Sequence, residues 1–222
     1  MFRRSLEFAV LYIAAPVALT IAQRWSAAHN KTLHIPIIPV LWIIAAVALW
    51  ALRHDKRFDF REFVRVRTVP RHEWLMMLAR FAVGATALTL GLCFVKPEAL
   101  LHFPKTRPAF WLVVMCCYPI FSVLAQGVVY RALYWNRYSR MFPERARIII
   151  GAIIFALAHT PYANAYALAF PFIGGLMFLS GYRRTRSLAF AAIEHALYGD
   201  FLFTIGWGEF FFHAGTLRLL GG

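Results

Sequence analysis

The sequence has few charged residues, few cysteines and no flexible linker. Only 15% of its 222 residues are charged, and its 10 acidic residues are outnumbered by 24 basic ones. A soluble domain of this length needs far more polar surface, so the shortage of charge excludes an ordinary soluble protein. No repeat, low-complexity stretch or Ser/Gly-rich linker divides the chain. We therefore expect residues 1–222 to fold as one unit.

The cysteines are scarce and lie in apolar surroundings. Cys93, Cys116 and Cys117 all fall inside apolar runs. Their spacing matches no metal-binding pattern. We interpret them as small core residues.

Long apolar runs dominate the chain: 61% of the residues are hydrophobic, and the mean hydropathy is +0.60. A helix that crosses ~30 Å of hydrocarbon needs about 20 residues. We therefore predict an all-α fold, a polytopic transmembrane helical bundle with about seven spans. The first apolar run is long enough to span, so we interpret it as a retained helix rather than as a signal peptide. The predicted spans are 6–23, 33–52, 75–95, 108–135, 148–160, 163–181 and 187–213, the last with a kink at its glycines.

The positions of the basic residues decide what the net charge of +14 and the pI near 10.4 mean. Basic residues cluster in 53–74, 136–147 and 182–186, and such clustering encodes membrane topology. We therefore expect a lipid bilayer, and no nucleic acid, as a partner. Seven crossings with a cytoplasmic N-terminus place all these loops on the cytoplasmic side, as in a bacterial inner-membrane protein. Residues 1–107 would hold three N-terminal spans, and residues 108–215 a C-terminal core.

Three clusters of polar residues lie inside the predicted spans, where ionisable groups are costly. In the first, AQGVVYRALYW, Gln126 and Tyr130 are four residues apart, as are Gly127 and Arg131, so each pair shares a helix face. Arg131 cannot lose its proton and needs an acceptor if it is buried. The alternative is that it snorkels to the cytoplasmic interface, which is how we interpret Arg80.

The other two clusters contain histidines. Phe155 and His159 lie four apart in FALAHT, and Glu194, His195 and Asp200 lie in AAIEHALYGD. Counted from the predicted cytoplasmic helix ends, the two histidines and the glutamine of the first cluster lie ~12–16 Å deep. Polar residues of three helices therefore converge on one depth. Two histidines and a carboxylate around a water-filled hollow could activate water or hold a metal.

The segments QGVVYR, FALAH and HALYGD resemble the three motifs of the CPBP/Abi family of intramembrane proteases, the CAAX-protease and bacteriocin-processing family. The family pattern is Glu-Glu-x-x-x-Arg, then Phe-x-x-x-His, then His-x-x-x-Asn or Asp. Order and spacing agree over residues 115–213. The resemblance implies a helical membrane peptidase in which a glutamate activates water and histidines support the oxyanion. Arg131, Phe155, His159 and His195 match the pattern, and Tyr130 is a common residue before the arginine.

The chain departs from this pattern where the chemistry needs a base. Gln126 and Gly127 occupy both glutamate positions, and Gly199 occupies the third-motif Asn position with Asp200 one residue later. Glutamine cannot accept a proton at neutral pH, so the expected general base is absent. We expect Arg131 to have found a new acceptor in Glu194, Asp200 or a backbone carbonyl.

Three functions remain open. The first is a CPBP homologue that is catalytically impaired or inactive and retains the cavity to bind a membrane peptide or protein partner; here a glutamate restored at Gly127 should create cleavage. The second is an active endopeptidase that uses His159 and His195 with Glu194 or Asp200 as a relocated base. The third is a small transporter or membrane assembly factor. We expect no cofactor; a zinc ion between the two histidines is a variant of the second hypothesis.

Overall fold

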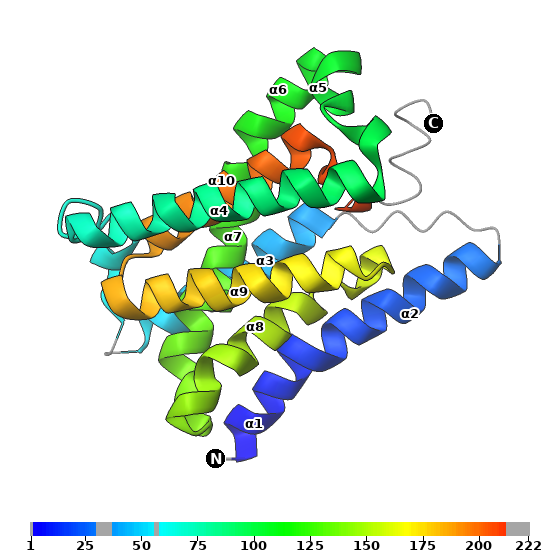
Figure 1. Ribbon diagram of the computed structural model, residues 1–222. Coiled ribbons are helices and arrows are strands. Elements are labelled where there is room, and N and C mark those ends of the chain that lie inside the picture. Colours follow the sequence, from blue (N-terminus) through cyan, green and yellow to red (C-terminus); the bar gives the residue numbers. More distant parts are fainter. Residues whose placement is uncertain (1, 30–36, 56–57, 212–222) are drawn as a thin grey trace.

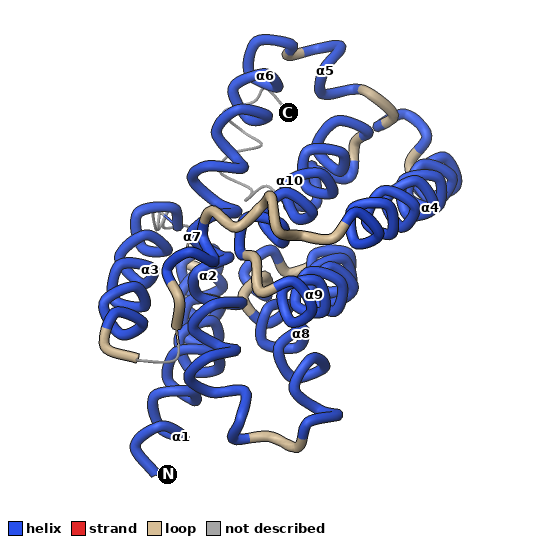
Figure 2. Tube along the Cα trace, turned by 90° about the vertical axis from the view of Figure 1, so that its left-hand side faces the viewer, coloured by secondary structure: helices blue, strands red, loops and turns tan. Residues whose placement is uncertain are grey.

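A computed structural model describes residues 2–29, 37–55 and 58–211. These residues form helices joined by short loops, with no strand among them (Figure 2). The all-helical prediction is therefore confirmed. In Figure 1 the long helices α2, α9 and α4 cross the view one above another, and α5 and α6 form the upper corner. The helices are α1 (Phe2–Ala9), α2 (Ala15–Ala28), α3 (Ile37–Arg53), α4 (Arg71–Val95), α5 (His102–Thr106), α6 (Pro108–Cys117), α7 (Leu124–Gly127), α8 (Arg147–Leu157), α9 (Tyr166–Thr185) and α10 (Leu188–Ile205).

Wider, π-helical turns join several of these helices into longer ones. They cover Val10–Ala14, Tyr118–Val123 and Val128–Tyr138. In the second, Pro119 has no N–H to donate, which interrupts the regular α-helical hydrogen bonds. Short 3-10 turns cover Phe60–Phe63, Pro97–Ala99, Ser139–Met141, Glu144–Ala146, Thr160–Tyr162 and Trp207–Phe211.

Among residues 2–29, 37–55 and 58–211, four continuous helices are long and apolar enough to cross a membrane, and α3 is a shorter apolar helix. Each of the seven predicted spans overlaps a helix, while the number of crossings stays a prediction. Helices α8 and α10 end at Leu157 and Ile205, before the predicted ends at 160 and 213, and residues 212–213 of the last predicted span lie outside the described residues. The four long helices are Phe2–Ser26, Arg71–Val95, Pro108–Met141 and Leu188–Ile205.

Glycine is required where α10 ends. Gly206 has φ of +132°, and a Cβ atom there would lie 2.3 Å from the carbonyl oxygen of Ala99. Both the backbone conformation and the space exclude other residues. The predicted break in the last span therefore lies at Gly206, and the chain continues as the turn Trp207–Phe211.

The first helical run packs against the C-terminal half. The Tyr12 hydroxyl donates a 2.8 Å hydrogen bond to the carbonyl oxygen of Val129, and Arg137 pairs with Glu7 at 2.6 Å. Tyr12 is fully buried and contacts the rings of Phe8 and Tyr134. The N-terminal helices thus brace the π-helical segment that carries Arg131.

Helices α8 and α9 pack with direct backbone contact. A Cβ atom on Gly175 of α9 would lie 2.8 Å from the Cα atom of Ala152 on α8, and one on Gly151 would lie 2.2 Å from Leu179. Only small residues allow two helices to approach this closely. The contact fixes Phe155 of α8 relative to Phe178 of α9.

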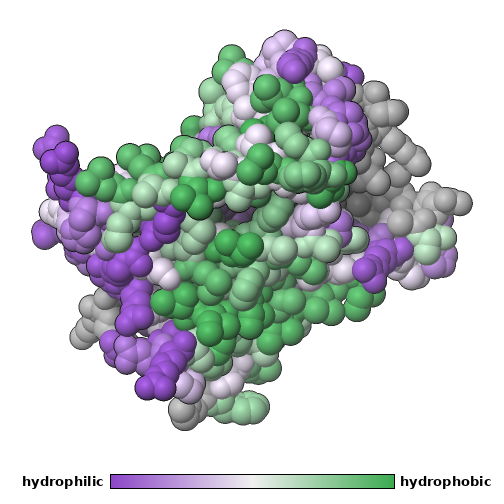
Figure 3. All heavy atoms as spheres, viewed as in Figure 1, coloured by the Kyte–Doolittle hydropathy of each residue, from purple (hydrophilic) through white to green (hydrophobic). Residues whose placement is uncertain are grey.

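Hydrophilic residues gather at one end of the bundle, at the left and lower left of Figure 3, where the arginine-rich loops lie in Figure 1. Ion pairs join these loops across the sequence. The buried carboxylates of Glu73 and Glu62 accept from Arg184 and Arg186 at 2.8 and 2.7 Å. The basic segments therefore lie together at one end, as the topology prediction requires, while their side of the membrane stays a prediction.

The interpretation of the cysteines as core residues was wrong. Cys93 and Cys116 are exposed, and Cys117 is half-buried. Cys93 and Cys116 lie on the apolar outer faces of membrane-type helices, where a residue can be hydrophobic without being inside the protein, and Cys117 lines the cavity described below. Apolar surroundings in the sequence therefore did not distinguish core from lipid-facing positions.

Candidate functional site

The phenyl ring of Phe155 lies at the centre of the predicted site. The imidazole rings of His159 and His195 meet it edge-on, with centroids 5.0 and 5.5 Å away, and the Arg131 guanidinium lies over it at 4.5 Å. Tyr130 contacts the same ring at 5.4 Å. The structure therefore brings together the arginine and both histidines of the three motifs around one side chain.

Arg131 is buried, with 2% of its surface exposed, so it does not snorkel to the interface. Its guanidinium lies between two aromatic rings, 4.5 Å from the centroid of Phe155 and 5.1 Å from that of Phe178. Neither terminal nitrogen has a hydrogen-bond partner among the described residues. The expectation of a carboxylate or carbonyl acceptor there was wrong. Cation–π contacts, which are worth ~0.5–2 kcal/mol each, take that place.

His159 follows α8 directly and is held by it. Its Nδ1 lies 2.8 Å from the carbonyl oxygen of Phe155, four residues earlier. A carbonyl only accepts, so Nδ1 carries the proton, and Nε2 of the neutral ring is the acceptor. In its neutral form, His159 therefore offers a lone pair at Nε2 to a ligand.

His195 is held by a residue that the sequence analysis did not identify. Its Nε2 lies 3.1 Å from the hydroxyl oxygen of Tyr118, and its ring stacks on Phe178 with centroids 4.8 Å apart. A signal for Tyr118 exists in the sequence, because Tyr118, Ser122 and Gln126 follow each other at intervals of four residues. Such spacing predicts a polar stripe along one helix face.

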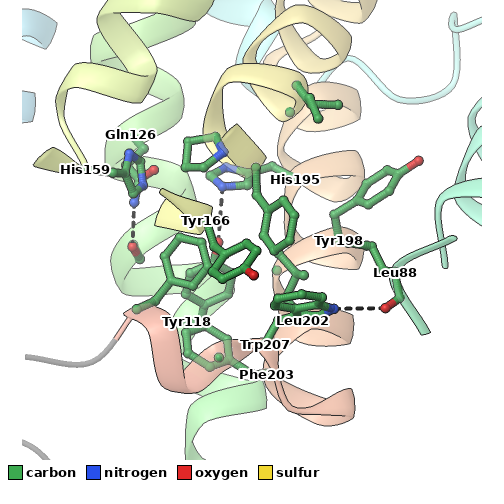
Figure 4. Close-up of a pocket in the computed structure, with 18 of the residues that line it drawn as sticks. Leu88, Tyr118, Gln126, His159, Tyr166, His195, Tyr198, Leu202, Phe203 and Trp207 are labelled. Carbon is green, nitrogen blue, oxygen red and sulfur yellow. Dashed lines mark hydrogen bonds between the residues drawn. The ribbon is translucent and has the colours of Figure 1, made fainter. Parts of the chain in front are cut away.

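These side chains border a cavity of about 1340 Å³ (Figure 4). Gln126, His159 and His195 line it together with Tyr118, and most of the other lining residues are aliphatic or aromatic, among them Tyr166 and Trp207. One wall is a face of α4, from Ala79 to Val95, whose role the sequence had left open. The cavity is thus built from both halves of the chain.

Gln126 and Gly127 face different directions. Gln126 lines the cavity, and its amide nitrogen donates a 2.7 Å hydrogen bond to the hydroxyl of Ser122. A Cβ atom on Gly127 would instead point at Leu188 of α10, 3.4 Å away. Position 126, not position 127, is therefore the first-motif position that lines the cavity, and cleavage by a Gly127→Glu variant stays a prediction.

The two candidate relocated bases lie outside the cavity lining. Glu194 is fully buried, and Arg80 of α4 donates to its carboxylate at 2.9 Å. Asp200 follows Gly199 on α10 and, like Glu194, is not among the cavity-lining residues that the structure describes. The snorkelling interpretation of Arg80 was also wrong, because this arginine lines the cavity wall and forms an ion pair.

The described residues contain no group of three His, Cys, Asp or Glu side chains arranged to hold a metal ion. His159 and His195 each use a ring nitrogen in a hydrogen bond to the protein. A two-histidine zinc site therefore gains no third protein ligand from the described residues.

Comparison with known proteins finds one similarity, which covers part of the chain. No curated protein and no solved structure shows significant similarity to the chain. Residues 106–199 match the family model of the type II CAAX prenyl endopeptidases, Rce1-like. The matched segment begins just before α6 and ends at Gly199, so it contains all three motifs and the ring cluster around Phe155. Residues 106–199 are therefore similar to the Rce1-like family of type II CAAX prenyl endopeptidases, the CPBP/Abi family that the three motifs resemble.

Proposed function

We propose that the protein is a pseudoenzyme of this family, which binds a membrane peptide or protein partner in its cavity without cleaving it efficiently. One observation carries the proposal: no Asp or Glu side chain lines the cavity within the described residues. Hydrolysis of a peptide bond at neutral pH needs a group that takes a proton from water. The neutral amide of Gln126 stands where that group would act.

The relocated-base hypothesis finds less support. The carboxylate of Glu194 is held by Arg80, and one of its oxygens already accepts at 2.9 Å. Moving this group toward His195 would leave a buried arginine–carboxylate pair broken, at a cost of ~3–5 kcal/mol. Asp200 lies one residue beyond Gly199, about 100° further around α10. Neither acid offers an oxygen to the cavity.

Retention of the cavity supports a binding role. Its lining is mainly aliphatic and aromatic, which suits the apolar part of a lipid-modified or membrane-embedded peptide. His159 Nε2 is placed to accept a hydrogen bond from such a ligand, as is the amide oxygen of Gln126, which has no partner among the described residues. A ligand that brings peptide N–H groups would satisfy these buried acceptors.

The experiment compares turnover of a prenylated CAAX peptide by the wild type, Gln126→Glu and Gly127→Glu in lipid nanodiscs. We expect the wild type to be slow and Gln126→Glu to gain ~10²–10⁴-fold, the contribution of a general base. Gly127→Glu is the matched control, because position 127 faces Leu188 rather than the cavity. Turnover by the wild type that equals that of Gln126→Glu would contradict the proposal.

We also propose that the basic end of the bundle faces the cytoplasm of a bacterial cell. The ion pairs gather three arginine-rich loops at one end, and Lys and Arg favour the cytoplasmic side of membrane proteins. The test is reaction of single-cysteine variants at the exposed positions Arg67 and Arg140 with a membrane-impermeant reagent. In this topology, labelling requires disruption of the inner membrane; labelling of intact spheroplasts would refute it.

A further inference from the structure

Tyr118 reaches into the site from the same long helix that carries the first motif, Pro108–Met141, and precedes Gln126 on it. It begins the π-helical turn Tyr118–Val123, and its side chain lines the cavity. Its hydroxyl oxygen lies 3.1 Å from Nε2 of His195, and the two rings meet edge-on with centroids 6.0 Å apart (Figure 4). The phenol therefore holds the imidazole nitrogen that would otherwise face the cavity.

The space for this phenol exists because residue 199 is a glycine. Gly199 lies one helical turn after His195 on α10. A Cβ atom at this position would lie 2.3 Å from Cε1 of Tyr118 and 2.4 Å from its hydroxyl oxygen. These distances are far below van der Waals contact, so any side chain at position 199 would displace the phenol. Tyr118 and Gly199 are mutually dependent.

His195 has no other hydrogen-bond partner among the described residues. Its ring is 6% exposed, lies between Phe178 and Phe155, and its Nδ1 is buried without a partner. The aromatic contacts fix the plane of the ring. Which ring nitrogen of His195 carries the proton is set by the hydrogen bond that the other ring nitrogen makes.

We propose that Tyr118 is the positioning residue of His195. The Tyr118 hydroxyl sets the orientation and the tautomer of the imidazole. The Tyr118 phenol also faces the ligand in the cavity. Gly199 is then the substitution that admits the phenol, in the place where the family pattern has a side chain that carries its own polar group. The inference concerns the hydrogen bond itself and does not depend on whether the protein cleaves peptides.

The first test observes the imidazole of His195 directly. The protein is labelled with ¹⁵N-histidine in nanodiscs, and the ring resonances of His195 are assigned by their loss in His195→Gln. Tyr118→Phe keeps the aromatic ring and removes only the hydroxyl, so we expect a shift of the His195 Nε2 resonance and a changed tautomer ratio. Tyr198→Phe is the matched control, because Tyr198 also lines the cavity, whereas the hydroxyl that bonds to His195 is that of Tyr118. Unchanged His195 resonances in Tyr118→Phe would overturn the proposal.

The second test uses thermal unfolding and separates positioning from packing. Gly199→Asn should lower the midpoint and shift the His195 resonances when Tyr118 is present. In the Tyr118→Ala background the space is open, so the same substitution should cost much less, and the new amide should restore a hydrogen-bonded His195 signal. Equal losses of stability in both backgrounds would show that the two positions are independent, and the proposal would fail.

Discussion

The contact between α8 and α9 at Gly175 gives the sharpest test of how the site is held. In Gly175→Ala the new methyl group would meet the Cα atom of Ala152 at 2.8 Å, and Cδ1 of Phe155 at 3.3 Å. A side chain can rotate away from such a clash, but backbone cannot. The two helices must therefore move apart, and Phe155 must shift from the face of the Arg131 guanidinium.

The expected change in the free energy of unfolding of Gly175→Ala is the sum of two opposing effects. Overpacking costs ~1–3 kcal/mol, and replacing glycine by alanine inside a helix returns ~0.5–1 kcal/mol. The backbone contact puts the cost in the upper part of its range, so we expect a net loss of ~1–2 kcal/mol. For a domain of this size, that lowers the unfolding midpoint by about 2–8 °C.

Gly127→Ala is the matched control. Its methyl group would lie 3.4 Å from Leu188, an ordinary contact, so only the helix-propensity gain of ~0.5–1 kcal/mol remains. The assay is thermal unfolding followed by circular dichroism at fixed detergent or nanodisc composition. Gly175→Ala melting at or above the wild-type temperature, or equal losses in the two variants, would refute this account of the packing.

Two further substitutions test the buried polar contacts by the same assay. Arg80→Met leaves the fully buried carboxylate of Glu194 without its cation. We expect the free energy of unfolding to fall by ~3 kcal/mol, the low end of the range for a buried pair, because Arg80 is 32% exposed. The double variant Arg80→Met/Glu194→Met should recover this stability. No loss in the single variant would show that Glu194 has another partner. Tyr12→Phe leaves the carbonyl of Val129 without its donor and should cost ~1–2 kcal/mol, whereas an unchanged midpoint would show that the first helix does not brace this segment.

The fold class and the gathering of the motifs could be predicted because both depend on local features of the sequence. Long apolar runs require helices, since every backbone polar group must be satisfied within the segment. The histidines and Arg131 match positions of the family pattern, so the resemblance predicted that these side chains would lie close together. Their chemical roles stay predictions that the experiments above address.

The partners of the buried polar groups could not be predicted, because each comes from a helix far away in the sequence. Arg80 and Glu194 are separated by 114 residues, and Tyr12 and Val129 by 117. Nothing local to Arg131 indicates that two phenyl rings, rather than a carboxylate, surround it. Interaction over such separations depends on how the helices pack, not on their own sequences.

The direction in which a side chain points from its helix could not be predicted from the sequence either. Consecutive helical residues point about 100° apart, so Gln126 and Gly127 were equivalent candidates until the rotation of their helix was known. The rotation decides that position 126 faces the cavity and that position 127 faces Leu188. It also explains the exposed cysteines, because an apolar residue faces lipid as readily as core.

The most direct test of the central claim is a single mass-spectrometric measurement on the wild-type protein. A prenylated CAAX peptide with a photoreactive group in its lipid is incubated in nanodiscs, irradiated and analysed as a protein adduct. Binding without cleavage predicts an adduct with the mass of the intact peptide, attached to cavity residues in 118–126 or 155–162. An adduct with the mass of the cleaved peptide, or attachment confined to lipid-facing residues outside the cavity, would contradict it.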